Sequence, residues 1–254
     1  MSSSTPAQQS RPSSLTERRK AATRMEIARA AAGLFVRHGL RATRAEDIAQ
    51  AAGIAPRTFY RYFASKEEAV APLYAAGAER WGEALRAAPA DLSVPEALEH
   101  AVRHTLTPGV GVSAASWELV RTLIRLTDTS PALRKVWAEV SHEAEGRLGE
   151  VLAERLGESP ARGSDGHPER GADGHPEGVP DGRPERAADN VGSGPAHSPG
   201  LRFAAAVASA AVRVAVEGWA AGEAPASGPK GPAAMALRNL EALRDFPWAD
   251  VARG

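Results

Sequence analysis

One stretch of 21 residues, Thr43 to Phe63, most constrains what this chain can fold into. Thr43 stands three residues before Glu46, the spacing of a capping box, so a short helix is predicted to begin at Thr43. Gly53 is suited to end that helix, and Pro56 is suited to the first turn of a second helix. Two short helices joined by a glycine-containing turn predict a helix-turn-helix, whose second helix enters the major groove of DNA.

The second helix, from Pro56 to about Tyr62, is predicted to have one apolar and one DNA-reading face. Phe59 and Phe63 are four residues apart and are expected to face inward. The side chains left pointing outward are Arg57, Thr58, Tyr60 and Arg61. Arginine can bind guanine through two hydrogen bonds, threonine can contact a thymine methyl, and tyrosine can bond phosphate. From residue types alone, the solvated face of an ordinary helical hairpin stays an open alternative.

The charge of the chain is unevenly distributed. Residues 1–66 contain twelve Lys or Arg and only four Asp or Glu, which gives this part a net charge of +8. Because the whole chain has a formal charge of zero, the remaining residues carry −8. A basic module joined to an acidic body indicates a polyanion-binding end, with an affinity that falls steeply as salt rises.

A longer ordered pattern surrounds the helix-turn-helix. TRMEIARAAAGLF, HGLRATRAEDIAQAAGI and TFYRYFASKEE follow one another within residues 23–70. In this order and spacing they resemble the TetR family of bacterial transcriptional regulators. The chain departs from the family pattern at Ala55, where Ser is usual, and at Arg57, where Gly is frequent. Ala55 lacks a capping oxygen, and Arg57 adds a base-reading side chain, so the operator sequence cannot be carried over.

The resemblance implies a DNA-binding transcriptional regulator, most often a repressor that a small-molecule effector releases from its double-stranded operator. It also implies an all-helical homodimer with two recognition helices one DNA turn apart. In the family, the position matching Lys66 lies against the DNA backbone. The residues predicted to bind DNA are Arg44, Arg57, Thr58, Tyr60, Arg61, Tyr62 and Lys66.

Composition supports an all-α fold. Apolar residues make up 43% of the chain but aromatic residues only 5%, a balance that favours helices packed through small side chains. The chain has no cysteine, which excludes disulfides, thiolate metal sites and a cysteine nucleophile. No apolar run is seen to approach the roughly 20 residues of a membrane span. Without a secretory signal, a cytoplasmic protein with no cofactor, metal or membrane partner is expected.

The domain plan follows from composition along the chain. Residues 1–14 are predicted to be a disordered tail, 15–65 the three-helix DNA-binding head, and 66–254 the regulatory and dimerisation body. The segment from Thr16 to Lys20 either extends the first helix, lies along DNA as an arm, or is a solvated tail. A Gly- and Pro-rich insert over about 158–200 is predicted to be disordered.

The body is expected to consist of helices with apolar stripes. The fourth helix is predicted to start at Lys66, after a capping box of Ser65 and Glu68, and to kink near Glu68 to Pro72. The other expected helices span 94–106, 114–127, 131–156, 201–221 and 233–244. The helices at 131–156 and 201–221 are predicted to form the dimer interface, with close approach at Ala205, Ala208 and Ala211 and buried area from Val212 and Trp219.

The effector pocket is predicted among the helices that span 66–127. Its proposed walls and polar groups are Trp81, His104, Trp117 and Arg121. Binding pockets are mostly apolar with a few orienting polar groups, and Arg121 would favour a ligand with a carboxylate or another acceptor. The alternative, with both tryptophans filling the core and Arg121 on the surface, stays open.

Two other classes of function are weighed against a regulator. A helical enzyme is disfavoured because no Ser-His-acid order, paired-carboxylate signature or phosphate loop is present. His100 and His104 have the spacing of a zinc helix, but Ala101 stands where HExxH needs its glutamate. His167 and His175 sit beside Gly and Pro in the insert and are not expected to bind metal. A ligand-independent DNA architectural protein remains the other alternative.

Overall fold

The computed structural model describes residues 15–109, 114–157, 198–248 and 250, and these contain helices but no strands. The all-α prediction is confirmed for this part of the chain. The elements are α1 (Leu15–His38), α2 (Ala45–Ala51), α3 (Pro56–Tyr62), the 3-10 helix η1 (Glu68–Val70), α4 (Ala71–Arg86), α5 (Val94–Leu106), α6 (Ala114–Thr129), α7 (Pro131–Arg155), α8 (Pro199–Ala221) and α9 (Pro232–Glu241). The predicted tail 1–14 and nearly all of the predicted insert lie outside the described residues.

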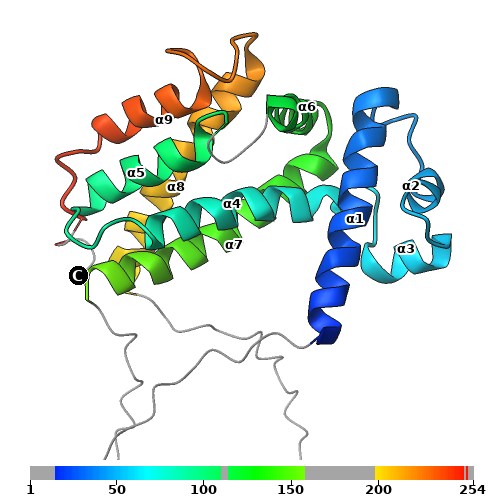
Figure 1. Cartoon of the computed structure of the whole chain (residues 1–254), viewed down its shortest axis with the longest axis horizontal. Helices are drawn as coiled ribbons and strands as arrows, with labels where there is room; N and C mark the ends of the chain where they lie inside the picture. Colours follow the sequence, from blue (N-terminus) through cyan, green and yellow to red (C-terminus); the bar gives the residue numbers. More distant parts are fainter. Residues whose placement is uncertain (1–14, 110–113, 158–197, 249, 251–254) are drawn as a thin grey trace, which may run out of the picture.

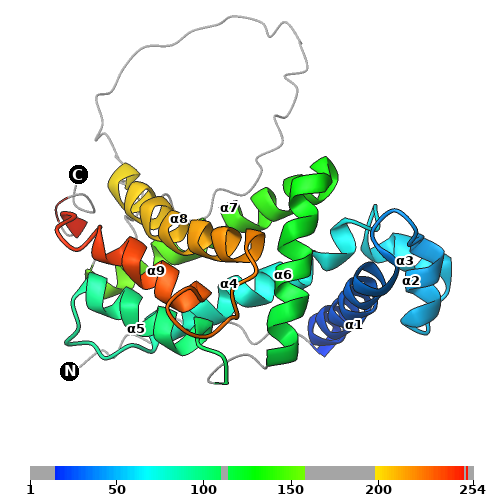
Figure 2. The same cartoon turned by 90° about the horizontal axis from the view of Figure 1, so that it is seen from above.

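The helices divide into a head and a larger body (Figure 1). Helices α1, α2 and α3 gather at one end, and α4 runs from the head into the body beside α7. Helices α5, α8 and α9 pack together at the far end, and α8 also contacts α7. Seen from above, α6 stands between the body and α1 (Figure 2), and it contacts α1, α7 and α8. Helix α6 therefore links both parts.

The start of α2 differs from the prediction. The helix begins at Ala45, and the Arg44 amide donates to Asp47 Oδ2 at 2.8 Å. Thr43 is buried, and its hydroxyl donates to the carbonyl of Gly39 at 2.9 Å. The Thr43 hydroxyl therefore binds the residue that follows α1 and not the first turn of α2. The capping box predicted for Thr43 and Glu46 is therefore wrong by one residue, with Asp47 as the carboxylate.

Helix α4 begins later than the predicted start at Lys66, and the predicted irregularity near Glu68 to Pro72 takes the form of a separate 3-10 helix. The short helix η1 precedes α4, and the α-helix begins at Ala71 with Pro72 in its first turn. Proline is tolerated there because a first-turn amide has no partner within the helix. Of the capping box predicted for Ser65 and Glu68, one half is confirmed, because Ser65 Oγ accepts from the amide of Glu68 at 3.2 Å. The Glu68 carboxylate accepts from the amide of Ala64 instead of Ser65.

One apolar cluster, the head–body core, joins the DNA-binding helices to the body. It draws buried side chains from α1, α2, α3, η1, α4, α6 and α7. Its larger members are Ile27, Leu34, Phe35, Ile48, Phe59, Phe63, Val70, Tyr74, Leu123, Leu133, Val136 and Val140. Tyr74 Oη also donates to the Leu123 carbonyl at 2.9 Å, and burial raises the pKa of this phenol, so it remains a donor. The core therefore crosses the predicted domain boundary after residue 65.

Four of the five predicted dimer contacts on α8 are wrong. Ala205, Ala208, Ala211 and Trp219 are buried within the single chain, and the first three belong to a body core that also draws on α4, α5, α7 and α9. Val212 is partly buried, and its place at a dimer interface stays a prediction. Small side chains permit close helix approach, and here that approach is intramolecular. The large apolar side chains of α8 that face solvent are Phe203 and Val214, which are 55% and 52% exposed.

Helix α8 is long and apolar enough, by length and composition alone, to match a membrane span. This differs from the expectation that no segment of the chain approaches that length. The core helix of a soluble protein passes the same test, and eight residues of α8 are buried against its neighbours. A single helix of this kind is weak support for a membrane protein.

Replacing Leu133 tests whether α7 stabilises the fold through the head–body core. Leu133 is fully buried, whereas Leu15 on α1 is 71% exposed, so the same change at Leu15 is a matched control. Leu133→Ala should lower the free energy of unfolding by about 2–5 kcal/mol, because it leaves a cavity. Leu15→Ala should change it by less than about 0.5 kcal/mol. Urea unfolding followed by circular dichroism measures both, and equal effects would contradict the assignment.

Candidate nucleic-acid interface

Helix α3 has the two faces that the sequence predicts. Phe59 and Phe63 are buried in the head–body core, with ring centroids 5.9 Å apart. Arg57, Tyr60 and Arg61 are exposed. Thr58 and Tyr62 are half-buried, so less of each side chain is available to a ligand. The core thus holds the helix while two arginines and a tyrosine project from the head.

The turn between α2 and α3 sets the angle of the recognition helix. Gly53 has a φ of +68°, in the left-handed region that disfavours residues with a Cβ. The amide of Ile54 donates to the carbonyl of Ala49 at 2.9 Å, and the Ile54 side chain packs on the head–body core. Ala55 precedes α3 without a side-chain cap, as its methyl group requires.

Arg24 of α1 ties the end of α3 in place. Its Nη1 donates to the carbonyl of Tyr62 at 2.9 Å, and its guanidinium lies 4.5 Å from the centroid of the Phe63 ring. A cation is favoured at a helix C-terminus because the carbonyls there have no partner within the helix. Sequence analysis did not single out Arg24, since nothing in its local pattern indicates a partner 38 residues away.

Tyr60 is exposed but not free of the protein. Its hydroxyl donates to Glu46 Oε1 of α2 at 3.3 Å. Partial desolvation and then the negative charge of Glu46 raise the pKa of Tyr60 above its ordinary value. The hydroxyl therefore stays protonated at neutral pH and remains a hydrogen-bond donor, which a phosphate oxygen can accept in place of Glu46.

Lys66 has a structural role that the sequence did not reveal. Its Nζ donates to the carbonyls of Leu40 at 2.7 Å and Thr43 at 2.8 Å. These bonds join the turn between α1 and α2 to the segment that leaves the head. An ammonium has three donors, so one N–H remains for another acceptor. The predicted contacts of Arg44 and Lys66 with DNA stay predictions.

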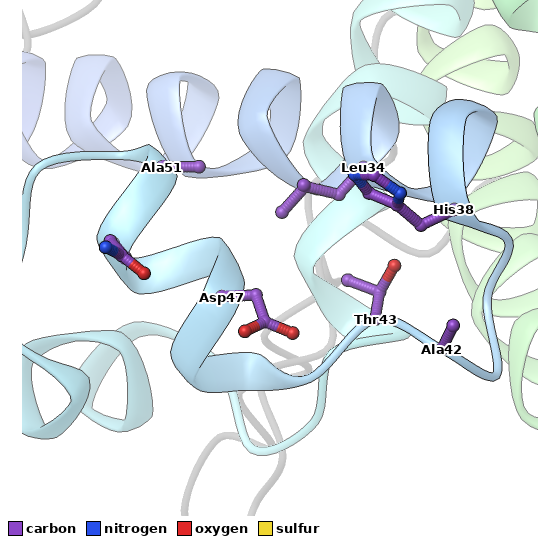
Figure 3. A pocket seen from close by; sticks show the side chains of 7 residues that line it. Leu34, His38, Ala42, Thr43, Asp47 and Ala51 are labelled. Carbon is purple, nitrogen blue, oxygen red and sulfur yellow. The ribbon is translucent and has the colours of Figure 1, made fainter.

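A cavity of about 460 Å³ lies between α1 and α2 (Figure 3). Its lining residues are Leu34, His38, Ala42, Thr43, Asp47, Gln50 and Ala51. None of the residues predicted to bind DNA or the effector belongs to this lining. Asp47 already accepts from the Arg44 amide, and Thr43 donates to Gly39.

The four predicted effector residues do not form one wall. His104 is exposed on α5, and Trp81 belongs to the core of the body. Trp117 and Arg121 are buried together at the junction of α6 and α8, beside Trp219. The Arg121 guanidinium lies 4.3 Å from the Trp219 ring centroid, and the Trp117 and Trp219 rings meet edge to face at 5.3 Å.

This junction, the tryptophan–arginine cluster of Trp117, Arg121 and Trp219, contains unsatisfied donors. Trp117 Nε1 and Arg121 Nε are buried without a hydrogen-bond partner. Arg121 Nη2 donates to the Ala224 carbonyl, and Nη1 pairs with Glu118 at 3.2 Å. The alternative to a pocket is thus wrong in placing Arg121 on the surface, where the structure buries it. Its other part is confirmed, because Trp81 and Trp117 both lie in apolar clusters.

A second cavity, of about 560 Å³, opens between α6, α7 and α8. Sequence analysis missed it, because its lining comes from three helices that are distant along the chain. Trp137 donates through Nε1 to Glu217 Oε1 at 2.7 Å, and Arg213 lies 3.3 Å from the same carboxylate. None of the four predicted effector residues lines it.

Metal binding has no support in the part of the chain that the structure describes. There, no group of three or more His, Asp or Glu side chains is placed to hold a metal ion. His167 and His175 lie outside the described residues.

Comparison with known proteins follows this geometry. Residues 27–71, which run from α1 to the start of α4, match the family described as bacterial regulatory proteins, tetR family. The HTH-type transcriptional regulator TcmR of Streptomyces glaucescens is 34% identical over 155 residues, covering 59% of this chain and 69% of that protein. The chain belongs to the TetR family. The resemblance inferred from the sequence is confirmed, and with it DNA binding and transcription regulation.

Solved structures also match the chain, at low sequence identity. Salmonella enterica GusR is 17% identical, with 91% of this chain and 92% of that chain covered and a TM-score of 0.45. A TetR-family regulator from Mesorhizobium loti MAFF303099 is 16% identical, with coverages of 89% and 97% and a TM-score of 0.48.

Proposed function

We propose that this TetR-family regulator is a cytoplasmic repressor that binds a two-fold symmetric operator as a homodimer and is released by a small molecule. The observation that carries the proposal is α3, which is fixed by Phe59 and Phe63 and presents Arg57, Tyr60 and Arg61 to solvent. Arginine and tyrosine can serve base recognition and phosphate binding on such a helix. The net charge of +8 in residues 1–66 supplies the attraction to DNA.

The exposed face of α8 supports a homodimer. Phe203, Val207, Ala210 and Val214 follow one another at spacings of four, three and four residues, so they share one side of the helix. Phe203 and Val214 are more than half exposed, and the two residues between them are partly exposed. A contiguous apolar stripe of this kind indicates a protein partner. A second copy would bury both stripes and pair two heads for two half-sites.

The tryptophan–arginine cluster supports the effector site. A buried donor without an acceptor costs about 1–3 kcal/mol, so a ligand with an acceptor would relieve that cost at Trp117 Nε1 and Arg121 Nε. The carboxylate paired with Arg121 belongs to Glu118, which is 68% exposed. The buried guanidinium is therefore only partly compensated, which favours an anionic ligand with an aromatic or apolar body.

Helix α6 provides a path from that cluster to the head. Arg121 and Leu123 are two residues apart, with Arg121 against α8 and Leu123 in the head–body core. A ligand that shifts α6 would therefore disturb the packing under α1. By linkage, such a ligand binds the DNA-free state more tightly, and DNA weakens ligand binding by the same factor.

Substitutions of Arg57 and Tyr60 should have different effects on DNA binding. Arg57→Ala should relax the base preference and cost about 1–3 kcal/mol of operator binding if Arg57 binds guanine through two hydrogen bonds. Tyr60→Phe should weaken binding to all sequences alike, because a phosphate contact carries no sequence information. Selection of sites from random duplex DNA measures both variants. An unchanged selected motif for Arg57→Ala would remove Arg57 from base recognition.

A charge on the exposed stripe of α8 should separate the dimer. Val214→Glu is expected to give folded monomers that bind the operator more weakly, because a buried unpaired carboxylate is costly at an interface. Val36→Glu is a matched control, since Val36 of α1 is 48% exposed. Sedimentation measures the oligomeric state and circular dichroism the helical content. Dimers that persist in Val214→Glu would place the interface elsewhere.

Changing Arg121 should abolish the response to an acidic effector while leaving DNA binding in place. Arg121→Met keeps most of the apolar stem and removes the charge, so a screen of carboxylic acid metabolites should find no ligand that releases DNA from the variant. Trp117→Phe should weaken the response less, because Phe keeps the ring contact and loses only the N–H. If both variants respond like the parent, the effector binds elsewhere, and the cavity between α6, α7 and α8 is the next candidate.

A further inference from the structure

The first two turns of α1 have no buried contacts. The pattern of apolar residues predicts a firm helix only from Thr23, yet α1 begins at Leu15. Every residue from Leu15 to Ala22 is exposed. Of the alternatives for Thr16 to Lys20, the structure therefore shows an extension of the first helix. Packing does not account for this segment, so the basic side chains of Arg18, Arg19 and Lys20 are available to a partner.

Three consecutive cations, Arg18, Arg19 and Lys20, lie on this extension. Within the described residues none of these three side chains has a hydrogen bond or an ion pair, and Glu17 is the one acidic side chain between Leu15 and Met25. Several arginines of the body instead form ion pairs with glutamates of the fold. Examples are the pairs Arg86–Glu154, Arg103–Glu99 and Arg213–Glu217.

The extension continues directly from the contact between α1 and the recognition helix. Arg24 binds the carbonyl of Tyr62, the last residue of α3. With a rise of about 1.5 Å per residue, Lys20 lies about 6 Å and Arg18 about 9 Å further along α1 from Arg24. Figure 1 shows this end of α1 projecting past α3. Successive helical residues point about 100° apart, so the three cations fan around the axis.

We propose that Arg18, Arg19 and Lys20 bind phosphates of the DNA that flanks the half-site read by α3. This inference rests on the proposed operator binding and adds a second contact region to it. Unpaired cations beside a DNA-reading helix match the charge of the backbone, and phosphate contacts strengthen binding without adding sequence information. The extension lengthens the footprint of each head and leaves base recognition to α3.

The test compares two operator duplexes, one trimmed at the outer ends of the half-sites and one with added flanking base pairs. In the variant Arg18→Ala, Arg19→Ala, Lys20→Ala, alanine preserves helix propensity while removing the three charges. The parent should bind the extended duplex at least about tenfold more tightly than the trimmed one, and the variant should bind both equally. Its log–log salt slope on the extended duplex should be shallower by about 2–3 per protomer, because each neutralised phosphate contributes about 0.9 to that slope.

A matched control removes the same charges from the body. Arg80, Arg147 and Lys230 are exposed, and their joint replacement by Ala should leave the preference for the extended duplex and the salt slope unchanged. The inference is overturned if the Arg18, Arg19 and Lys20 variant keeps the parent's preference, or if it loses affinity equally on both duplexes. If the proposed function itself is wrong, the result is distinguishable, because the parent protein would then show no sequence-specific binding to either duplex.

Discussion

The head–body core is the constraint on which the rest of the structure depends. Phe35 and Phe59 of the head pack in the same cluster as Tyr74, Leu123 and Leu133 of the body. Because protein interiors are close-packed, helices that share such a cluster cannot move independently without repacking. The position of the recognition helix α3 thus depends on packing against the body as well as on the turn between α2 and α3. A small shift of α6 would change the packing of α1 and α3.

This shared packing supports the proposed control of DNA binding by a ligand. Arg121 lies in a buried cluster against α8, and Leu123, half a turn further along α6, lies under the head. The same helix therefore contacts both the interior of the body and the first helix of the DNA-binding head. Tyr74 strengthens the connection, since its buried hydroxyl binds the Leu123 carbonyl and joins α4 to α6. Under the proposed release by a ligand, the ligand would need to shift only α6, which contacts the proposed effector site and the head.

The features that the sequence predicted correctly depend on residues that are close together along the chain. The burial of Phe59 and Phe63 follows from helical spacing, and the turn at Gly53 follows from its backbone freedom. The hydrogen-bond partners of Lys66 could not be predicted, because they are the carbonyls of Thr43 and Leu40, which are 23 and 26 residues away along the chain. On α8, the spacing of apolar residues indicated a helix with more than one apolar side. It did not indicate which of these sides is buried within the same chain. Ala208 is buried within the chain, and Val214 is the exposed side chain.

Hydrogen exchange of the full chain, with and without operator DNA, tests most directly whether the core couples the two parts. If α6 and the head form one packed unit, DNA binding should slow amide exchange in α3 and also in residues 119–127 of α6. The same slowing should be absent with a duplex of unrelated sequence at equal concentration. Protection confined to residues 43–66, with unchanged exchange in α6, would contradict the account, because the head would then bind DNA without engaging the body.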